Sequence, residues 1–322
     1  MIFVLLVGLA ISPISMQQIS HVPIFDGDDA YSYLVDQCDF GPRPPGSDNL
    51  SLCRLMIAET FESFGWDVGF QNFTYNNTEC VNIIVKWASE NNAPLILGAH
   101  YDTRPPGPSD PGSGVGANDG ASGVAVVLEL ADSLPEEIRS NVEIVLFDAE
   151  DSGNILGWDW ILGSTHYVSQ LSSERKNTIK SMVLLDMVGD IDLELPRERS
   201  STVSLQNSIW SIADQLGYND TFTDSYGWSV LDDHRPFQDA GIAAVDIIQT
   251  PFPSYWHTLD DTPDKCSAES LEIVGEVLEV FIVEEDYNNT MFPLNPPILL
   301  FVGVILIVAF ALPIIYAQLK RR

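Results

Sequence analysis

Short apolar runs that alternate with helix-forming stretches constrain the fold of this chain more than any other feature of its sequence. The runs are rich in Val, Ile and Leu and are bounded by polar or turn-forming residues, as is typical of buried strands. They lie at residues 81–86, 94–99, 142–148, 181–187 and 243–248. Helical patterns begin at Ser122 and recur near 159–170, near 208–216 and at 268–284. Strands separated by helices predict an α/β domain with a largely parallel sheet.

Apolar segments at the two ends of the chain predict its location. Residues 298–316 carry no charge and would form about 28 Å of helix, enough to cross a hydrocarbon core. A basic tail follows, which predicts a cytoplasmic C-terminus. The first residues look like the apolar core of a signal peptide. We therefore expect a signal peptide at 1–19, an extracytoplasmic domain at 20–290 and a single membrane anchor with a short cytoplasmic tail at 291–322, which places the protein in the cell membrane.

The strongly acidic composition excludes one class of partner. The chain contains 46 acidic and 15 basic residues, for a net charge of −31. Nucleic-acid binding needs a basic face that neutralises phosphates, so we expect no nucleic-acid partner. A hydrophobic content of 45% and an aromatic content of 10% also exclude a disordered acidic tail.

The four cysteines are compatible with an exported domain. They are Cys38, Cys53, Cys80 and Cys266, an even number that permits disulfides in more than one pairing. Cys38 and Cys53 flank a loop rich in Gly and Pro, and we expect these two to pair. No Cys-x-x-Cys spacing occurs, so a structural zinc site made of cysteines is not expected.

Side chains of the kind that bind metals follow the predicted strands. In open α/β sheets, ligands bind beyond the carboxyl ends of the strands. The side chains at these places are His100 and Asp102 in GAHYDT, Asp119 in GANDGASG, Glu150 and Asp151 in DAEDSG, Asp186 in LLDMVGD, and His257 in WHTLDD. Mixed imidazole and carboxylate ligands suit zinc. So many carboxylates without a cation would cost several kcal/mol, and the sequence therefore predicts a zinc site.

Two local spacings suggest how the work at this site is divided. The adjacent Glu150 and Asp151 permit one carboxylate to bind the metal while its neighbour takes protons. Asp102 follows His100 by two positions and is placed to orient that imidazole.

The motifs HYDT, GANDGASG, DAED, LLDMVGD and WHTLDDT occur in the order found in one known family. Over residues 38–280 the chain resembles the zinc exopeptidases that include co-catalytic aminopeptidases and animal-type glutaminyl cyclases. This resemblance implies a three-layer fold, with a mixed, mostly parallel sheet and helices on both faces. It also implies a zinc-dependent enzyme of a metallopeptidase family whose substrate is the N-terminus of a peptide or protein.

The two branches of that family imply different metal sites. The aminopeptidase pattern implies two zinc ions bridged by Asp119, one completed by Asp151 and His257 and the other by His100 and Asp186. Asp151 stands where aminopeptidases usually carry Glu. The cyclase pattern implies one zinc, held by Asp119, Asp151 and His257. In both patterns Glu150 transfers protons, and in the cyclase pattern Asp186 and Asp233 form a carboxylate network beside it.

Two segments resemble the cyclase branch more closely. DDHRPF at 232–237 and PFPSYWHT at 251–258 are similar to cyclase segments that line the pocket, where Phe252 and Trp256 would flank the substrate. A further pocket tryptophan is implied by the resemblance, and spacing does not decide between Trp158 and Trp160.

We therefore expect a glutaminyl-peptide cyclotransferase that converts N-terminal glutamine to pyroglutamate and releases ammonia, with one zinc ion. The alternative in the same family is a zinc aminopeptidase with two zinc ions. A non-catalytic peptide-binding surface protein is a third hypothesis, but such a protein should have lost Glu150 or a ligand, and this chain has lost none.

Overall fold

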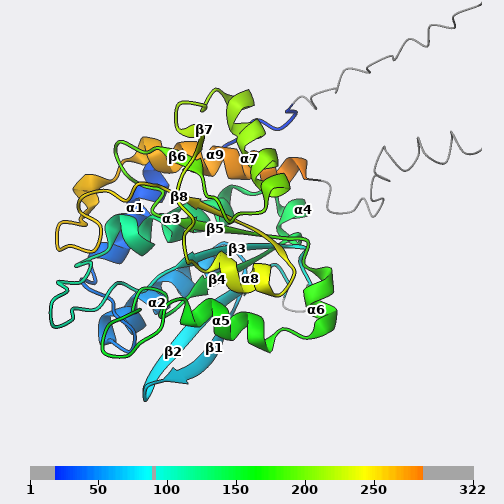
Figure 1. Ribbon diagram of the computed structural model, residues 1–322. Coiled ribbons are helices and arrows are strands. Elements are labelled where there is room, and N and C mark those ends of the chain that lie inside the picture. Colours follow the sequence, from blue (N-terminus) through cyan, green and yellow to red (C-terminus); the bar gives the residue numbers. More distant parts are fainter. Residues whose placement is uncertain (1–18, 89–91, 286–322) are drawn as a thin grey trace, which may run out of the picture. The chain divides into compact units, whose positions relative to one another are not determined.

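The computed structural model describes residues 19–88 and 92–285 (Figure 1). A central sheet of six strands contains, in spatial order, β1 (Asp67–Tyr75), β2 (Thr78–Lys86), β4 (Val142–Phe147), β3 (Leu95–His100), β5 (Ser181–Asp186) and β8 (Ala243–Ile248). The strands β4, β3, β5 and β8 run parallel, whereas β1 and β2 form an antiparallel hairpin whose second strand also pairs antiparallel with β4. The sheet is therefore mixed. A separate short pair joins β6 (Leu195–Arg197) and β7 (Phe222–Tyr226).

Helices cover both faces of the sheet, so the fold has three layers (Figure 1). One face carries α1 (Gly27–Cys38), α3 (Ser122–Ser133), α7 (Val203–Leu216) and α9 (Ala268–Glu284), which pack on one another or on β3, β5 and β8. The opposite face carries α5 (Leu162–Gln170) and α8 (His234–Asp239), which pack together. The remaining helical segments are α2 (Asp48–Ser63), η1 (Ala117–Ala121), α4 (Glu136–Arg139), α6 (Ser173–Thr178) and η2 (Pro263–Lys265).

Side-chain caps begin three of the longer helices. Asp26 accepts hydrogen bonds from the amides of Asp28 and Asp29 at the start of α1, and Ser47 accepts one from Leu50 at the start of α2. Ser267 caps α9 in the same way. Such caps satisfy amides that have no partner within the helix, and each stabilises its helix by about 1 kcal/mol.

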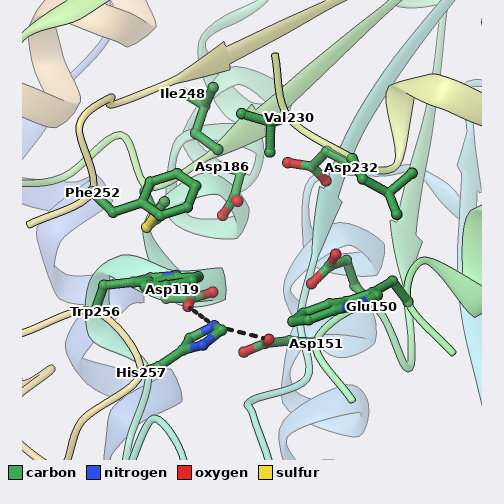
Figure 2. Close-up of a pocket in the computed structure, with 13 residues that line it drawn as sticks. Asp119, Glu150, Asp151, Asp186, Val230, Asp232, Ile248, Phe252, Trp256 and His257 are labelled. Atoms are coloured by element: carbon green, nitrogen blue, oxygen red, sulfur yellow. Dashed lines mark ion pairs between the residues drawn. The ribbon is translucent and has the colours of Figure 1, made fainter. Parts of the chain in front are cut away.

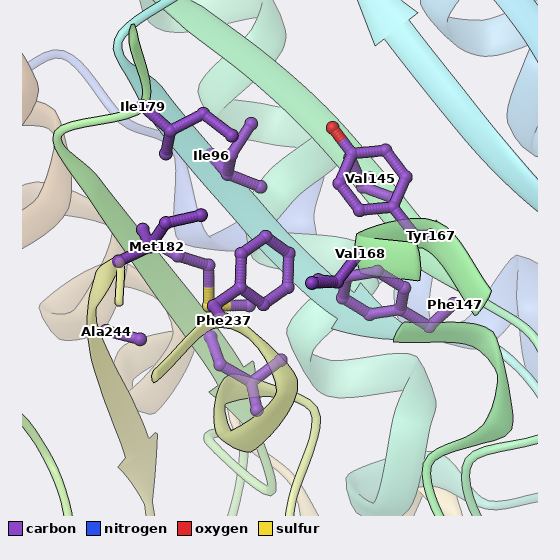
Figure 3. Packing of buried hydrophobic residues seen from close by; sticks show 11 residues of the cluster. Ile96, Val145, Phe147, Tyr167, Val168, Ile179, Met182, Phe237 and Ala244 are labelled. Carbon is purple, nitrogen blue, oxygen red and sulfur yellow. The ribbon is translucent and has the colours of Figure 1, made fainter. Parts of the chain in front are cut away.

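The core between the sheet and the α5–α8 face is formed by alternate residues of the strands. Ile96, Phe147 and Met182 point to this side and pack with Tyr167 of α5 and Phe237 of α8 (Figure 3). On the other face α3 lies very close to the sheet. Gly123 permits this approach, since a Cβ at this position would lie only 2.3 Å from the carbonyl oxygen of Leu185. These two packing layers fix the orientation of the parallel strands and hence the place where their carboxyl ends meet.

The predicted strands and helices agree with these elements, and the expected mixed α/β sheet with helices on both faces is confirmed. The apolar run at 81–86 is the second half of an antiparallel hairpin that we did not expect. Its partner β1 alternates half-exposed and exposed residues, so it lacks the continuous apolar run that marked the other strands.

The membrane part of the fold prediction needs correction. Within residues 19–88 and 92–285, no helix is long and apolar enough to cross a membrane. The long helix α9, for example, carries glutamates along its length, from Glu269 to Glu284. The expected span at 298–316 and the signal-peptide segment up to residue 18 lie outside the described residues.

The expected disulfide is also absent. Cys38, Cys53, Cys80 and Cys266 are all free and buried thiols. Cys53 is a buried residue of α2, and Cys38 lies at the end of α1 with its thiol directed to the carbonyl oxygen of Val115. The pairing of Cys38 with Cys53 was therefore wrong, because proximity to one loop does not place two side chains face to face.

Candidate active site

The metal-type side chains come together at one edge of the sheet, as expected. His100 and Asp186 are the last residues of β3 and β5. Glu150 and Asp151 lie in the loop after β4, and His257 lies in the loop after β8. Since these four strands are parallel neighbours, their carboxyl ends deliver the side chains to a single place.

Asp119 lies at the centre of the site and contacts both histidines. Its Oδ1 is 3.1 Å from Nε2 of His100, and the same nitrogen is 3.2 Å from Oδ1 of Asp186. Its Oδ2 is 3.4 Å from Nε2 of His257, and that nitrogen is 3.0 Å from Oδ1 of Asp151 (Figure 2). Two groups of three potential ligands therefore share Asp119, and within each group the ligand atoms lie within 4.8 Å of one another.

The backbone around the site adopts conformations that non-glycine residues rarely accept. Ala149, Met187 and His257 have φ angles of 60°, 48° and 56°. All three have a left-handed backbone conformation. His257 is itself a site residue, and Ala149 and Met187 directly adjoin Glu150 and Asp186. Such strain costs about 1–3 kcal/mol per residue and is characteristic of positions that must aim a functional side chain.

Asp102 contacts both His100 and the loop after β4. One of its oxygens lies 3.5 Å from Nδ1 of His100, and its role in orienting that imidazole stays a prediction. The same carboxylate accepts hydrogen bonds from the backbone amides of Glu150, at 3.1 Å, and Asp151, at 3.3 Å. One buried carboxylate therefore holds the end of β3 and the loop after β4 in a common position.

Asp261 has a similar role that we did not predict. Its two oxygens accept hydrogen bonds from the backbone amides of Asn118, at 2.8 Å, and Asp119, at 3.1 Å. Burial and, to a smaller extent, the nearby charge of Asp119 raise the pKa of Asp261 to about 7. Asp261 belongs to the motif WHTLDDT, in which we assigned a role to His257 alone.

Arg104 is the second unpredicted residue at the site. Its Nη1 lies 3.3 Å from Oδ1 of Asp151, and its Nε donates a hydrogen bond of 2.8 Å to Asp110. The guanidinium also lies 4.9 Å from the ring centroid of Trp160. Arg104 follows HYDT directly in the sequence, but a single arginine beside a Pro-rich loop gave no reason to connect it with Asp151.

A cavity of about 200 Å³ opens beside these groups (Figure 2). Its polar wall consists of Asp119, Glu150, Asp151, Asp186, Asp232 and His257, and its apolar wall consists of Trp160, Met187, Val230, Leu231, Ile248, Phe252 and Trp256. Phe252 and Trp256 line it as predicted, with ring centroids 4.4 Å apart, and the Trp256 ring stacks on His257 at 3.6 Å. The cavity therefore joins a carboxylate cluster to an aromatic wall.

In two places the structure shows which of two nearby side chains lines the cavity. Trp160 lines the cavity, whereas Trp158 packs on Tyr75 with a centroid distance of 5.2 Å. Asp232 lines the cavity between Val230 and Glu150 (Figure 2), whereas its neighbour Asp233 is fully buried and does not line it. The network role expected of Asp233 remains a prediction, and Asp232 occupies the position beside the cavity.

A buried carboxylate holds the loop that carries Asp232. Glu198 accepts hydrogen bonds from the amides of Val230 at 3.0 Å, Ser200 at 2.9 Å and Ser201 at 2.6 Å. Val230 and Asp232 both line the cavity, so Glu198 positions one wall of the site without touching it. We did not predict this residue, because the segment PRERSS contains no catalytic or metal motif.

Burial and mutual repulsion raise the pKa values of the carboxyls in the site. Burial raises the pKa of Glu150 and of Asp232 well above the usual values, and neighbouring carboxylates raise both further. Burial also raises the pKa of Asp151, to about 7. Asp119 is the exception. Burial alone would raise its pKa, but the hydrogen bond with His100 and the positive charges of His100, His257 and Arg104 together outweigh burial and lower it.

The arrangement fits a bound cation. The Oδ2 atom of Asp119 is buried and has no hydrogen-bond partner, although it faces Asp151 and His257. An unsatisfied buried carboxylate oxygen is costly, and a divalent cation would satisfy it and relieve the repulsion among its neighbours. One imidazole and two carboxylates in each group are ligands that suit zinc and leave an open coordination position.

Fold and site together define an α/β enzyme with a candidate metal site of carboxylates and histidines at the carboxyl edge of a mixed sheet. The family model "Peptidase family M28" matches residues 82–282. The chain belongs to peptidase family M28, which confirms the resemblance found in the motifs.

Relatives and solved structures narrow the class of enzyme. A bovine glutaminyl-peptide cyclotransferase-like protein is 27% identical over 278 residues, covering 75% of this chain and 72% of the relative. Glutaminyl cyclase of Porphyromonas gingivalis has 31% identity and a TM-score of 0.73, covering 81% of this chain and 98% of that chain. A Zn-dependent exopeptidase of Parabacteroides distasonis has 30% identity and a TM-score of 0.73, covering 84% and 100%. The protein is therefore an enzyme of the glutaminyl cyclase or exopeptidase type.

Proposed function

We propose that this enzyme cyclises N-terminal glutamine of peptides to pyroglutamate and releases ammonia, using one zinc ion held by Asp119, Asp151 and His257. The observation that carries the proposal is the position of Glu150. Its carboxyl lines the same cavity as the three proposed ligands and faces the aromatic wall of Phe252 and Trp256 (Figure 2). The similarity to named glutaminyl cyclases supports the same reaction.

The proposed chemistry forms one bond and breaks one. The α-amine of the substrate attacks the side-chain amide carbon of its own glutamine, and the bond from that carbon to the amide nitrogen breaks. Zinc at Asp119, Asp151 and His257 would polarise the amide carbonyl. Glu150 accepts a proton from the attacking amine and delivers it to the departing nitrogen, which leaves as ammonia. Burial raises the pKa of Glu150, which makes its carboxylate a stronger proton acceptor.

The side chains around the cavity have positioning roles in this proposal. Phe252 and Trp256 would hold the glutamine side chain against the ligands and keep water away from the reacting carbon. Asp186 and Asp232 lie on the polar wall of the cavity together with Glu150. The charge of Asp232 would favour the protonated form of Glu150 after the first transfer.

A single ion is proposed because the two ligand groups differ in their access to the cavity. Asp119, Asp151 and His257 all line the cavity, whereas His100 of the second group does not. An ion in the first group would be open to substrate. The aminopeptidase alternative is favoured by one specific observation, the presence of the second group formed by His100, Asp119 and Asp186.

Mass spectrometry of one peptide distinguishes the two reactions. The full chain is incubated with a peptide that begins with glutamine, with and without a chelator. A loss of about 17 Da, the mass of ammonia, faster than the spontaneous reaction and abolished by chelation, is the expected result. A peptide shortened by one residue would instead make the protein an aminopeptidase. Binding without any turnover would leave only the non-catalytic hypothesis.

A further inference from the structure

A second hollow lies beside the active-site cavity, on the α5–α8 face of the sheet. It has a volume of about 440 Å³ and is lined by residues of α5, α6 and α8, including Lys176, Arg235 and Asp239, and by Leu231 from the segment before α8. Leu231 also lines the active-site cavity, and it is 57% exposed. Ile161, another lining residue, directly follows Trp160 of the cavity wall. We call this hollow the cationic groove, and its rim is continuous with the rim of the active site.

The charge of this groove is opposite to that of the protein. The chain carries a net charge of −31, yet the groove contains two cations and a single carboxylate, Asp239. Other cations of the described domain are committed to partners. Arg175, next to Lys176, pairs with Glu143 at 2.8 Å, and Arg197 pairs with Asp224 at 2.8 Å.

The side chains of Lys176 and Arg235 have no such partner. Within the described part of the chain, neither forms an ion pair or a side-chain hydrogen bond. They come from different elements, Lys176 from α6 and Arg235 from α8, and only the tertiary structure brings them to one hollow. Two half-buried, unpaired cations beside an active site are a feature that an anionic ligand would complete.

We propose that the cationic groove binds acidic side chains of the peptide substrate at the positions that follow its N-terminal residue. The inference rests on the proposed function, since it requires the N-terminal residue to occupy the active-site cavity. An extended peptide advances about 3.3 Å per residue, so the next few residues can pass over Leu231 into the groove. The enzyme then favours peptides with Asp or Glu near the N-terminus.

The overall charge of the protein predicts the opposite preference, so a preference for acidic peptides would identify a local contact. A net charge of −31 repels acidic peptides and attracts basic ones over long distances. A preference for acidic peptides therefore requires a local cationic contact, and it cannot arise from the general field of the protein.

The test compares three glutamine-initiated peptides of equal length that differ only at positions three and four, with Asp, Asn or Lys in both places. The expected order of kcat/KM is Asp, then Asn, then Lys, with a change of about two- to fivefold per charge that falls mainly on KM. The difference should shrink as salt is raised, because ion pairs of this kind are screened. Spontaneous cyclisation of each peptide is subtracted.

Variants connect the preference to the groove. Lys176→Gln and Arg235→Gln should each reduce the ratio of the Asp to the Asn peptide, and the double variant should abolish it. Lys265→Gln is the matched control, because it removes one positive charge from a lysine that pairs with Asp264 and does not line the groove. The control should keep the full ratio.

Each outcome decides between the two proposals. Equal kcat/KM for the three peptides, or a preference for acidic peptides that survives in the double variant, overturns the groove and leaves the cyclase proposal intact. Removal of the first residue instead of cyclisation overturns the cyclase proposal, and the same ratios then still test the groove. If no peptide is converted at all, both proposals fail.

Discussion

The guanidinium of Arg104 lies against the carboxylate of Asp151, with Nη1 3.3 Å from Oδ1. The same arginine also donates to the backbone oxygen of Asp151, at 3.2 Å, and to Asp110. Asp151 is one methylene shorter than the glutamate usual in aminopeptidases, so fewer rotamers can bring its carboxylate to the site. Arg104 and His257 both contact Oδ1 of that carboxylate, and Arg104 restricts its position.

Removal of this contact should weaken the metal site. Arg104→Gln is expected to lower zinc affinity and kcat/KM by about ten- to a hundredfold, because residues that hold metal ligands in place have effects of this size. Arg104→Lys should recover only part of the loss, since an ammonium group cannot contact Asp110 and Asp151 as a planar fork. Chelator competition measures the affinity. Arg197→Gln, which removes a paired arginine away from the cavity, is the control. Unchanged zinc affinity in Arg104→Gln would contradict this role.

Glu150→Gln should abolish turnover while leaving zinc bound. The amide is similar in size but cannot accept a proton from the attacking amine, so kcat is expected to fall by roughly a hundredfold or more. Zinc content by elemental analysis should equal that of the wild type. The comparison variant Asp151→Asn should lose zinc as well as activity. A Glu150→Gln enzyme that works at the normal rate would remove Glu150 from the mechanism.

Glu198→Gln should disturb the cavity wall and the fold together. The amide group of glutamine would place a donor against the amides of Ser200, Ser201 and Val230, so we expect a loss of about 2–3 kcal/mol in the free energy of unfolding. Because Val230 and Asp232 would shift, kcat should fall even at temperatures where the variant is fully folded. Urea unfolding and kinetics on the same sample measure both effects.

The stability effect of Glu198 should also depend on pH. Burial opposes ionisation, but the hydrogen bonds from Ser200, Ser201 and Val230 outweigh it and lower the pKa of Glu198. A lowered pKa contributes stability above the unfolded value of about 4.3, and this stability is lost as the pH falls through the folded value. The difference between wild type and Glu198→Gln should therefore be constant above about pH 5 and shrink below it. A difference that persists unchanged in acid would show that the carboxylate charge plays no part.

Glu129 should produce the opposite pH dependence. It lies in α3, is 4% exposed, and has its pKa raised to about 7, first by burial and then by Asp132 and Asp29. A raised pKa contributes stability that is complete below the unfolded value of about 4.3 and is lost as the pH rises through 7. Relative to wild type, Glu129→Gln should therefore gain stability between pH 5 and pH 8. Thermal unfolding at the two pH values measures this, with the exposed Glu137→Gln as control. A constant difference across this range would contradict the raised pKa.

The four cysteines should behave as buried free thiols. Burial raises the pKa of Cys53 to about 11 and that of Cys38 to about 12, so both should resist alkylation at neutral pH in the folded protein. In denaturant without reductant, iodoacetamide should modify all four. Incomplete modification that reductant restores would reveal a disulfide that the structure lacks.

The sequence by itself determined the class of fold and most of the site. Apolar runs marked the parallel strands, and His100, Asp186 and the Glu150–Asp151 pair stood where those runs ended. Because parallel strands deliver their carboxyl ends to one edge, the convergence of these side chains followed from chain order alone. The motifs added Asp119 and His257, which lie on loops whose course no periodicity predicts.

Only the tertiary structure decided which of two neighbouring residues faces the cavity. Asp232 and Asp233 are chemically equivalent in sequence and both are buried, but at the start of α8 only Asp232 lines the cavity. The same holds for Trp160 and Trp158. The contacts of Glu198 and the meeting of Lys176 with Arg235 also depend on how separate elements pack. Residue spacing describes the chain locally, whereas the direction of a side chain and its distant partners are set by packing.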